Sequence, residues 1–129
     1  MINDLPVNLT EKEYSVIDML QGLGLPRTEA TAIVCLKDCK ELKSQHIELI
    51  SGLRQPEVSI AIRPLKERGW VDEQSEKMNK GKGRPVKFYR LTVPFLQIIR
   101  TLEEEFLRDN KEKEIALRRL RELKTILQN

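Results

Sequence analysis

The feature that most constrains this chain is a pair of short helices predicted on either side of Gly52. Ser44 can cap the first helix, and Pro56 is expected in the first turn of the second, which is expected to end at Gly69. Proline suits the first turn of a helix and glycine suits the position after its last turn, so the sequence marks both ends of the second helix. Two short helices joined by a glycine-containing turn predict a helix-turn-helix unit.

Two further helices are predicted before this unit. Thr10 and Glu13 have the spacing of a capping box, which indicates a helix over residues 10–23. A second helix is expected over residues 26–39, and its middle is apolar nearly all the way round, as is typical of a buried central helix. Residues 41–43 are predicted to form a short extended link to the helix-turn-helix unit.

After Gly69 the pattern changes to two strand candidates, at residues 70–74 and 86–91, with a charged, glycine-rich stretch between them. This arrangement predicts a β-hairpin with a long tip. The stretch 77–90 holds six basic residues and no acidic one, namely Lys77, Lys80, Lys82, Arg84, Lys87 and Arg90. Because the whole chain has a net charge of +3, the remainder carries −3. This concentrated patch indicates contact with a polyanion, and a solvated basic loop is the alternative.

The second helix of the helix-turn-helix unit has two distinct faces. Val58, Ile62 and Leu65 repeat at helical spacing and are predicted to face the core. The outward positions are then Pro56, Ser59, Ile60, Arg63 and Glu67, with Gln55 and Glu57 at the exposed N-terminal end. An outward isoleucine favours a contact surface, and an ordinary solvated face with one stray apolar residue is the alternative. Pro64 predicts a kink or a tightened last turn, or an earlier end of this helix.

A long last helix is predicted from a Thr92 cap to about Leu127. Its apolar residues form two stripes, Phe95, Ile98, Ile99, Leu102 and Phe106, then Ala116, Leu120, Leu123 and Leu127. The polar run 108–114 interrupts them, so one helix and two helices both remain open. The charges on this segment are balanced, which fits either a solvated helix or the seam between two copies. We favour the seam, because a lone long helix with a narrow apolar stripe needs a partner.

Several classes of protein are disfavoured by the sequence. No apolar stretch approaches the roughly 18 residues of a membrane span, and no signal peptide is evident, so we expect a cytoplasmic protein. No nucleophile–base pair, phosphate-binding loop or zinc-protease motif is present, and we expect neither catalysis nor a cofactor. Cys35 and Cys39 lie one helical turn apart, and His46 is the only histidine. These are too few ligands for a metal site, so core packing is favoured over metal or redox sensing.

The stretch from Leu25 to Thr92 resembles the winged helix-turn-helix domain of the MarR, ArsR and TrmB-like prokaryotic regulators. The matching text reads GLPRTEATAIVCLKDCKEL, RQPEVSIAIRPLKERGWVDE and GKGRPVKFYRLT. Within it, the pattern Val-Ser-x-x-Ile-x-x-Leu-x-x-x-Gly at 58–69 is similar to the recognition helix of that family. The resemblance implies a helix in the major groove of DNA, a basic wing beside it, and dimerisation through terminal helices.

We therefore expect a mainly α fold with a small β-hairpin, a winged helix-turn-helix domain followed by a long C-terminal dimerisation helix. The DNA-binding domain is expected at 1–92 and the dimerisation segment at 93–129. The predicted function is a homodimeric, sequence-specific regulator of transcription that binds double-stranded DNA. The alternative is a winged-helix module that binds protein in a transcription or chromatin complex. The target sequence, the sign of regulation and any small-molecule effector stay open.

The expected contact residues fall into two groups. Those predicted to contact DNA are Gln55, Pro56, Glu57, Ser59, Ile60 and Arg63 on the helix, and Lys80, Lys82, Arg84 and Lys87 on the wing. Gln and Arg can pair with adenine and guanine, and Ile can touch a thymine methyl group. Arg84 lies between a glycine and a proline and is expected in a minor groove, whereas the lysines meet phosphates. The predicted dimer contacts are Leu102, Phe106, Leu120, Leu123 and Leu127.

Overall fold

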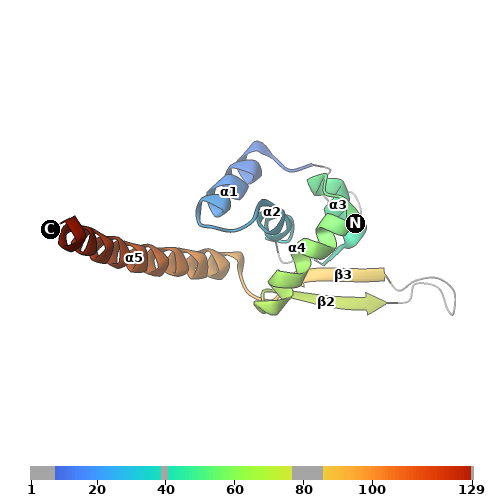
Figure 1. Cartoon of the computed structure of the whole chain (residues 1–129). Helices are drawn as coiled ribbons and strands as arrows, with labels where there is room; N and C mark the ends of the chain where they lie inside the picture. Colours follow the sequence, from blue (N-terminus) through green and yellow to red (C-terminus); the bar gives the residue numbers. More distant parts are fainter. Residues whose placement is uncertain (1–7, 39–40, 77–85, 129) are drawn as a thin grey trace.

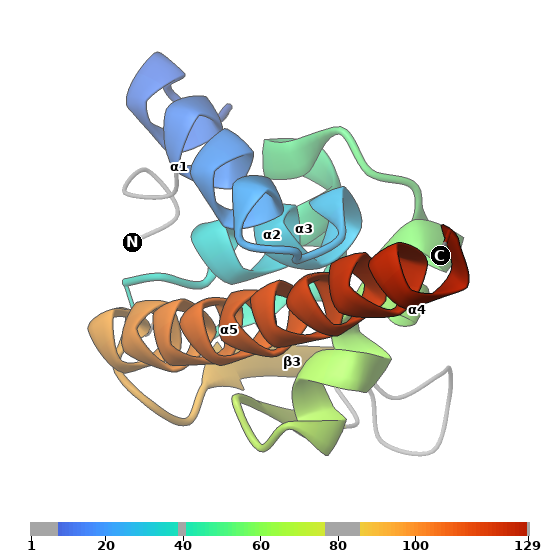
Figure 2. The same cartoon turned by 60° about the vertical axis from the view of Figure 1, so that its left-hand side comes forward.

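The computed structural model describes residues 8–38, 41–76 and 86–128 (Figure 1). Helices α1 to α3 lie on one side of a small sheet in both views (Figures 1 and 2), and α5 extends away from them in Figure 1. The elements are, in chain order, α1 (Glu11–Gly22), α2 (Arg27–Cys35), β1 (Leu42–Lys43), α3 (Ser44–Ser51), α4 (Gln55–Glu67), β2 (Val71–Glu76), β3 (Val86–Leu91) and α5 (Phe95–Gln128). The expected mainly α architecture with a small β-hairpin is confirmed, and a third strand joins the hairpin to form a small antiparallel sheet.

The predicted capping box begins α1. The Thr10 hydroxyl accepts a hydrogen bond from the Glu13 N–H at 3.1 Å, and the Thr10 N–H donates to Oε1 of Glu13 at 2.8 Å. The other oxygen of Glu13 lies 3.2 Å from Nζ of Lys37, just after α2. Partial burial raises the pKa of Glu13, but the hydrogen bonds from Thr10 and Lys37 outweigh it, and the net pKa is lowered. One carboxylate thus caps α1 and joins it to the end of α2.

Helix α2 is the buried centre of the fold, as its apolar composition predicts. Residues 30–34 are all buried, and α2 contacts α1, α3 and α4. The predicted extent of this helix, to about Cys39, is wrong, because α2 ends at Cys35. The Leu36 N–H donates to the carbonyl of Ile33 at 3.0 Å, and the Lys37 N–H donates to that of Val34. These bonds span three residues and tighten the last turn, which closes the helix early.

The sheet has three antiparallel strands in the order β1-β3-β2. The expected hairpin is β2 with β3, in a register that pairs Val71 with Leu91. The extended link expected at 41–43 is a strand, since Leu42 and Lys43 pair with β3 opposite Tyr89 and Phe88. Both Leu42 and Tyr89 are buried in the core. This long-range pairing stabilises β1 as a strand, because it buries one large residue from β1 and one from β3.

Helix α4 runs through Pro64 without ending there. The Arg68 N–H donates to the carbonyl of Pro64 at 3.0 Å, so helical bonding continues beyond the proline. The predicted tightening of the last turn is present, because the Gly69 N–H donates to the carbonyl of Lys66, three residues back, at 2.9 Å. Gly69 has a φ of +78°, a left-handed conformation that favours glycine. The chain turns there from α4 into the buried Trp70 and β2.

Helix α5 is one continuous helix of 34 residues, which settles the choice between one helix and two. Thr92 does not cap it. The Thr92 hydroxyl instead donates to the carbonyl of Gly69, and the carbonyl of Pro94 accepts the N–H groups of the first turn. Only Ile98 and Leu102 of α5 are fully buried in the core. Within residues 8–38, 41–76 and 86–128, no helix is long and apolar enough to cross a membrane.

Candidate nucleic-acid interface

Helices α3 and α4 form the predicted helix-turn-helix unit, and local hydrogen bonds set its turn. Gly52 ends α3 with a φ of +77°. The Leu53 N–H then donates to the Ser51 hydroxyl at 3.1 Å, and the Arg54 N–H donates to Oε1 of Glu57 at 3.0 Å. The second of these bonds satisfies a backbone donor at the start of α4. The turn and the first residues of α4 are therefore held in one conformation.

The two predicted faces of α4 are confirmed by burial. Val58, Ala61, Ile62 and Leu65 are buried in the core. The side chains predicted for the outward face and N-terminal end are all exposed: Gln55, Pro56, Glu57, Ser59, Ile60, Arg63 and Glu67. Ile60 is 66% exposed, and Nε2 of Gln55 lies 3.4 Å from the Ser59 hydroxyl one turn away. The face thus combines an apolar contact with adjustable polar donors and acceptors.

Leu49 on α3 is a second large apolar residue in the helix-turn-helix unit that faces solvent, and the sequence analysis did not select it. Its side chain is 65% exposed, whereas Ile47 and Ile50 beside it are buried. The exposure of Leu49 could have been predicted from helical spacing, because a helix that turns positions 47 and 50 toward the core turns position 49 toward solvent. Leu49 therefore joins Ile60 as a candidate contact residue of this unit.

The β2–β3 hairpin leads toward the predicted wing. In Figure 1 this hairpin extends to the right, away from α5. Lys87 is exposed on β3, two residues from the buried Tyr89. The two residues lie on the same face of the strand, but Lys87 lies beyond the edge of the core. Arg90 lies with Nε 3.8 Å from Oδ2 of Asp72 on β2, which joins the two strands. The other predicted wing residues, Lys80, Lys82 and Arg84, lie outside the described residues.

Arg68 connects the end of α4 to α5. Its Nη1 donates to both carboxylate oxygens of Glu105 at 3.3 Å, and its guanidinium lies 4.5 Å from the centre of the Trp70 ring. Burial raises the pKa of Glu29 on α2, and the charge of Arg68 opposes that shift. The Arg68 side chain therefore interacts with Glu29 on α2, with Glu105 on α5 and with Trp70 in the turn that follows α4.

Cys35 and His46 are both placed in structural roles. Cys35 packs against the core, and burial, followed by the negative charge of Glu13, raises the pKa of its thiol to about 12. Nδ1 of His46 accepts a hydrogen bond from the Lys43 N–H at 3.4 Å at the start of α3. Cys39 lies outside the described residues. Among the residues that the structure describes, no three His, Cys, Asp or Glu side chains are grouped to hold a metal ion.

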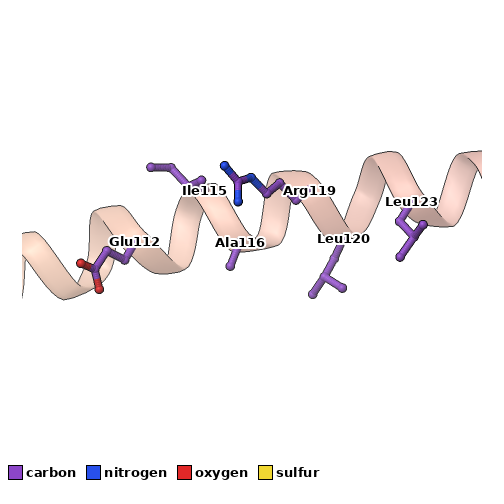
Figure 3. A pocket seen from close by; sticks show the side chains of 6 residues that line it. All are labelled: Glu112, Ile115, Ala116, Arg119, Leu120 and Leu123. Atoms are coloured by element: carbon purple, nitrogen blue, oxygen red, sulfur yellow. The ribbon is translucent and has the colours of Figure 1, made fainter.

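The predicted dimer contacts on α5 lie in two different environments. Leu102 is 3% exposed in the core of its own chain, and Phe106 is half-buried. Leu120, Leu123 and Leu127 are 62%, 50% and 76% exposed, and nothing in the described chain covers them. Figure 3 shows Ala116, Leu120 and Leu123 on one side of the helix, where they help to line a shallow open hollow.

Comparisons with known proteins match this architecture to solved structures. No family model and no curated protein matches the chain. Bordetella bronchiseptica BpsR, whose DNA binding is regulated by 6-hydroxynicotinic acid, aligns with a TM-score of 0.50 and 14% identity over 76% of this chain and 77% of BpsR. The transcriptional regulator PA4135 aligns with a TM-score of 0.50 and 22% identity over 92% of this chain and 88% of PA4135.

The archaeal chromatin protein TrmBL2 aligns with a lower TM-score of 0.49, at 23% identity over 81% of this chain. This chain spans only 41% of TrmBL2. The fold assignment therefore rests on BpsR and PA4135 and on the element order observed here, in which a helix-turn-helix unit precedes a hairpin and a terminal helix. By its architecture, this chain is a winged helix-turn-helix protein with a long C-terminal helix.

Proposed function

We propose that this chain is a sequence-specific regulator of transcription that binds double-stranded DNA. In this proposal α4 enters the major groove, and the basic segment 77–90 contacts the flanking backbone or minor groove. The observation that carries the proposal is the outward face of α4, which is fully exposed at its N-terminal end and follows a fixed turn. A helix-turn-helix protein presents that part of its second helix to the base edges.

The residue types on this face suit base recognition. Gln55 can donate and accept in a pair with adenine, and Arg63 can form two parallel bonds with guanine. Ile60, at 66% exposure, can contact the methyl group of thymine. The DNA binding of BpsR and the regulatory role of PA4135 agree with this function for the shared fold.

The charge distribution supports a second contact through the hairpin. The six cations of 77–90 sit on a chain that is otherwise net acidic. Lys87 is exposed at the base of this segment, and the sequence adds Lys80, Lys82 and Arg84. Lysine and arginine bind backbone phosphates through release of counterions, without regard to sequence. The hairpin would therefore supply affinity and position while α4 supplies specificity.

The proposed partner of α5 is a second copy of the chain. The exposed leucines of its C-terminal half form an apolar stripe that a solitary helix would leave in water. Dimers of helix-turn-helix proteins read two half-sites on the DNA. In this proposal residues 1–92 form the DNA-binding domain and residues 93–129 the dimerisation segment.

The proposal is tested by selecting duplexes from a random pool with the full chain and measuring the affinity for the selected site at several salt concentrations. We expect one enriched sequence and an affinity that falls steeply with salt. Arg63→Ala should lower the preference for the selected site by about 1–3 kcal/mol. Arg100→Ala removes an exposed cation from α5 and is the matched control. An absence of duplex binding would favour the protein-interaction module, and an equal loss on selected and random DNA would exclude base reading by Arg63.

A further inference from the structure

The exposed apolar stripe at the end of α5 faces the same side of the helix as the residues that the core buries. The stripe consists of Ala116, Leu120, Leu123 and Leu127, all of them exposed. Eighteen residues make about five turns of an α-helix, so Ala116 lies in line with Ile98 along the helix. By the same spacing Leu120 lies in line with Leu102, and both Ile98 and Leu102 are buried in the core. A partner that covers the stripe therefore lies on the side of α5 that holds the chain's own core, beyond the edge of that core.

The part of α5 that a second helix can reach is limited in length. Phe106 is half-buried, and every side chain from Lys111 to Gln128 is exposed. This free part, residues 111–128, is about 27 Å long at 1.5 Å per residue. Nearer the domain, the face of α5 that carries the stripe is filled by the core. A second helix can therefore cover the stripe only along the free part.

A parallel partner does not fit this arrangement. The facing stripes of a parallel pair continue side by side toward the N-terminal ends of both helices. At Ile98 and Leu102 the second helix would need the space that the chain's own core fills. A parallel pair would also place Arg119 beside Lys124 of the partner subunit at the edge of the seam, where like charges repel. The second copy therefore has to run in the opposite direction.

We propose that two copies of this chain pair through the free parts of α5 alone, in antiparallel orientation, with Leu120 opposite Leu123 of the partner subunit. The inference rests on the homodimer of the proposed function and adds the extent, orientation and register of its contact. In this register the last helical residue, Gln128 of the partner subunit, lies opposite Ile115, short of the part that the core covers. Leu102, a dimer contact by the sequence prediction, stays in the core of its own chain.

This register matches the stripe with itself. Leu120 faces Leu123 of the partner subunit at the centre of the seam, and Ala116 faces Leu127 of the partner subunit further out. The twofold axis repeats both contacts, so every residue of the stripe is covered. The pairing of the small Ala116 with a leucine lets the two helices interdigitate. In Figure 3, Ala116, Leu120 and Leu123 point to one side of α5, as a single seam requires.

The edges of the stripe are matched as well. Leu117 and Ile126, 48% and 69% exposed, flank the stripe on opposite sides. The twofold axis of an antiparallel pair brings each edge beside the same edge of the other helix. Ile126 then lies beside Arg119 of the partner subunit, and Leu117 lies beside Lys124 of the partner subunit. Long basic side chains cover apolar surface with their methylene stems and keep their charge in water, so both apolar edges are covered.

Neighbouring antiparallel registers fit less well. A shift of seven residues toward the domains places Lys113 opposite Leu123 of the partner subunit and Asp109 opposite Leu127 of the partner subunit. Two charges are then covered without an opposite charge, which is unfavourable. A shift of seven residues the other way leaves Leu120 beyond the end of the partner helix and uncovered. The proposed register is therefore the one that covers the whole stripe and no charge.

Lys113 has a complementary partner in the proposed register. It lies just beyond Gln128 of the partner subunit, at the C-terminal end of the facing helix. The last turn of α5 contains no basic residue of its own. The carbonyl groups at the C-terminal end of a helix carry partial negative charge, which a nearby cation stabilises. The second copy therefore supplies at this helix end the cation that the single chain lacks there.

Disulfide formation between full-length chains tests the orientation. The background is Cys35→Ala with Cys39→Ser, and the single variants Ala116→Cys and Leu127→Cys carry different affinity tags. A disulfide needs Cα atoms within about 7 Å, so a mixture in glutathione buffer should yield the mixed product. Neither variant should join to itself, because identical residues lie about 16 Å apart along the helices. A disulfide of Ala116→Cys with itself is the parallel result and would overturn the proposal.

The same chemistry tests the register. Asp109→Cys, mixed with Leu127→Cys in the same background, should give no product, because the two residues face each other only in the register shifted toward the domains. Formation of that disulfide in place of the one between Ala116→Cys and Leu127→Cys would contradict the proposed register. A dimer in sedimentation that yields no mixed product between Ala116→Cys and Leu127→Cys would contradict the proposal as well.

A matched pair of substitutions tests the seam independently of cysteine chemistry. Leu120 and Leu107 are 62% and 61% exposed, but they lie on opposite sides of α5. Leu120→Asp should weaken the dimer about tenfold or more, because it covers an unpaired carboxylate. Leu107→Asp should leave the dissociation constant unchanged, and equal effects of the two variants would contradict the proposal. Sedimentation measures the dimer without DNA, so a wild type that stays monomeric would overturn this inference while DNA binding keeps its own assay.

Discussion

Arg68, the C-cap residue of α4, donates to Glu105 on α5, with Nη1 3.3 Å from each carboxylate oxygen. The two residues are 37 positions apart in sequence, and the pair joins the proposed reading helix to the proposed dimerisation helix. The guanidinium also stacks on Trp70 in the turn between α4 and β2. The end of α4 is therefore fixed to two elements at once.

Arg68→Ala should lower the free energy of unfolding by about 1 kcal/mol, because it removes a partly exposed ion pair and a cation–π contact together. Glu105→Gln removes only the charge of the partner and keeps the stack on Trp70, so its loss should be smaller. Urea denaturation of both variants measures the difference. Equal losses would show that the stack contributes nothing.

Thr10→Ala should destabilise the protein by about 0.5–2 kcal/mol, the usual effect of removing a helix N-cap. The Thr10 hydroxyl accepts the Glu13 N–H, and alanine leaves that donor without its partner. Thermal unfolding at neutral pH measures the effect. Thr125→Ala, an exposed threonine near the end of α5, is the control and should change the midpoint little.

Glu13 should contribute to the acid sensitivity of the fold. Its pKa in the folded protein lies below the ordinary value of 4.5, since hydrogen bonds outweigh the effect of burial. The carboxylate therefore adds stability that is present above pH 4.5 and is lost as the pH falls through the lower folded pKa. Glu13→Gln should remove this part of the pH dependence. If the variant and the wild type lose stability in parallel on acidification, the assignment is incorrect.

The Cys35 thiol should be unreactive in the folded protein. Burial and the neighbouring Glu13 raise its pKa to about 12, so almost no thiolate exists at neutral pH. In the Cys39→Ser variant, alkylation by iodoacetamide should be roughly a hundredfold slower than in the same chain unfolded in urea. Mass spectrometry follows the reaction. Rapid modification of the native variant would reopen a sensing role for Cys35.

The two kinds of wing cation should behave differently on DNA. Arg84→Ala is expected to reduce the preference for A·T-rich flanks, because narrow A·T minor grooves attract an inserted arginine. Lys82→Ala should weaken binding to all sequences alike and lower the salt slope by about one. Titrations on A·T-rich and G·C-rich flanks at several salt concentrations compare them. Identical profiles for the two variants would mean that the wing is a nonspecific clamp.

The helix-turn-helix unit was predictable because its signals are local. Pro56 and Gly69 mark the ends of α4, and helical spacing alone separates the buried Val58 from the exposed Ile60. Strand β1 was not predicted as a strand, because two residues carry no periodicity and Leu42 is in a strand only through its pairing with Tyr89. Long-range pairing of this kind leaves no local pattern in the sequence.

The end of α2 and the continuity of α5 were also not predicted by local patterns in the sequence. Helix α2 ends at Cys35, where backbone hydrogen bonds spanning three residues tighten its last turn. The apolar residues of this helix give no sign in the sequence of where it ends. The polar run 108–114 breaks the apolar stripe of α5, but five of its seven residues are Arg, Lys or Glu, which are good helix formers, and the helix continues. The candidate DNA-contact side chains of α4 are exposed as predicted, whereas the exposed Leu49 of α3 was not predicted, because its neighbours Ile47 and Ile50 gave only the inward face of that helix.

The continuity of α5 has a consequence for the geometry of a DNA site. In the proposed homodimer, α5 separates each domain from the exposed leucines of its C-terminal half, so the number of residues between them sets how far each domain lies from the dimer contact. Each seven-residue repeat adds about 10 Å of helix, which equals about three base pairs along DNA. Lengthening or shortening α5 by one repeat would move each of the two domains by this length, so the half-site spacing that the proposed dimer prefers would depend on a helix that touches no base.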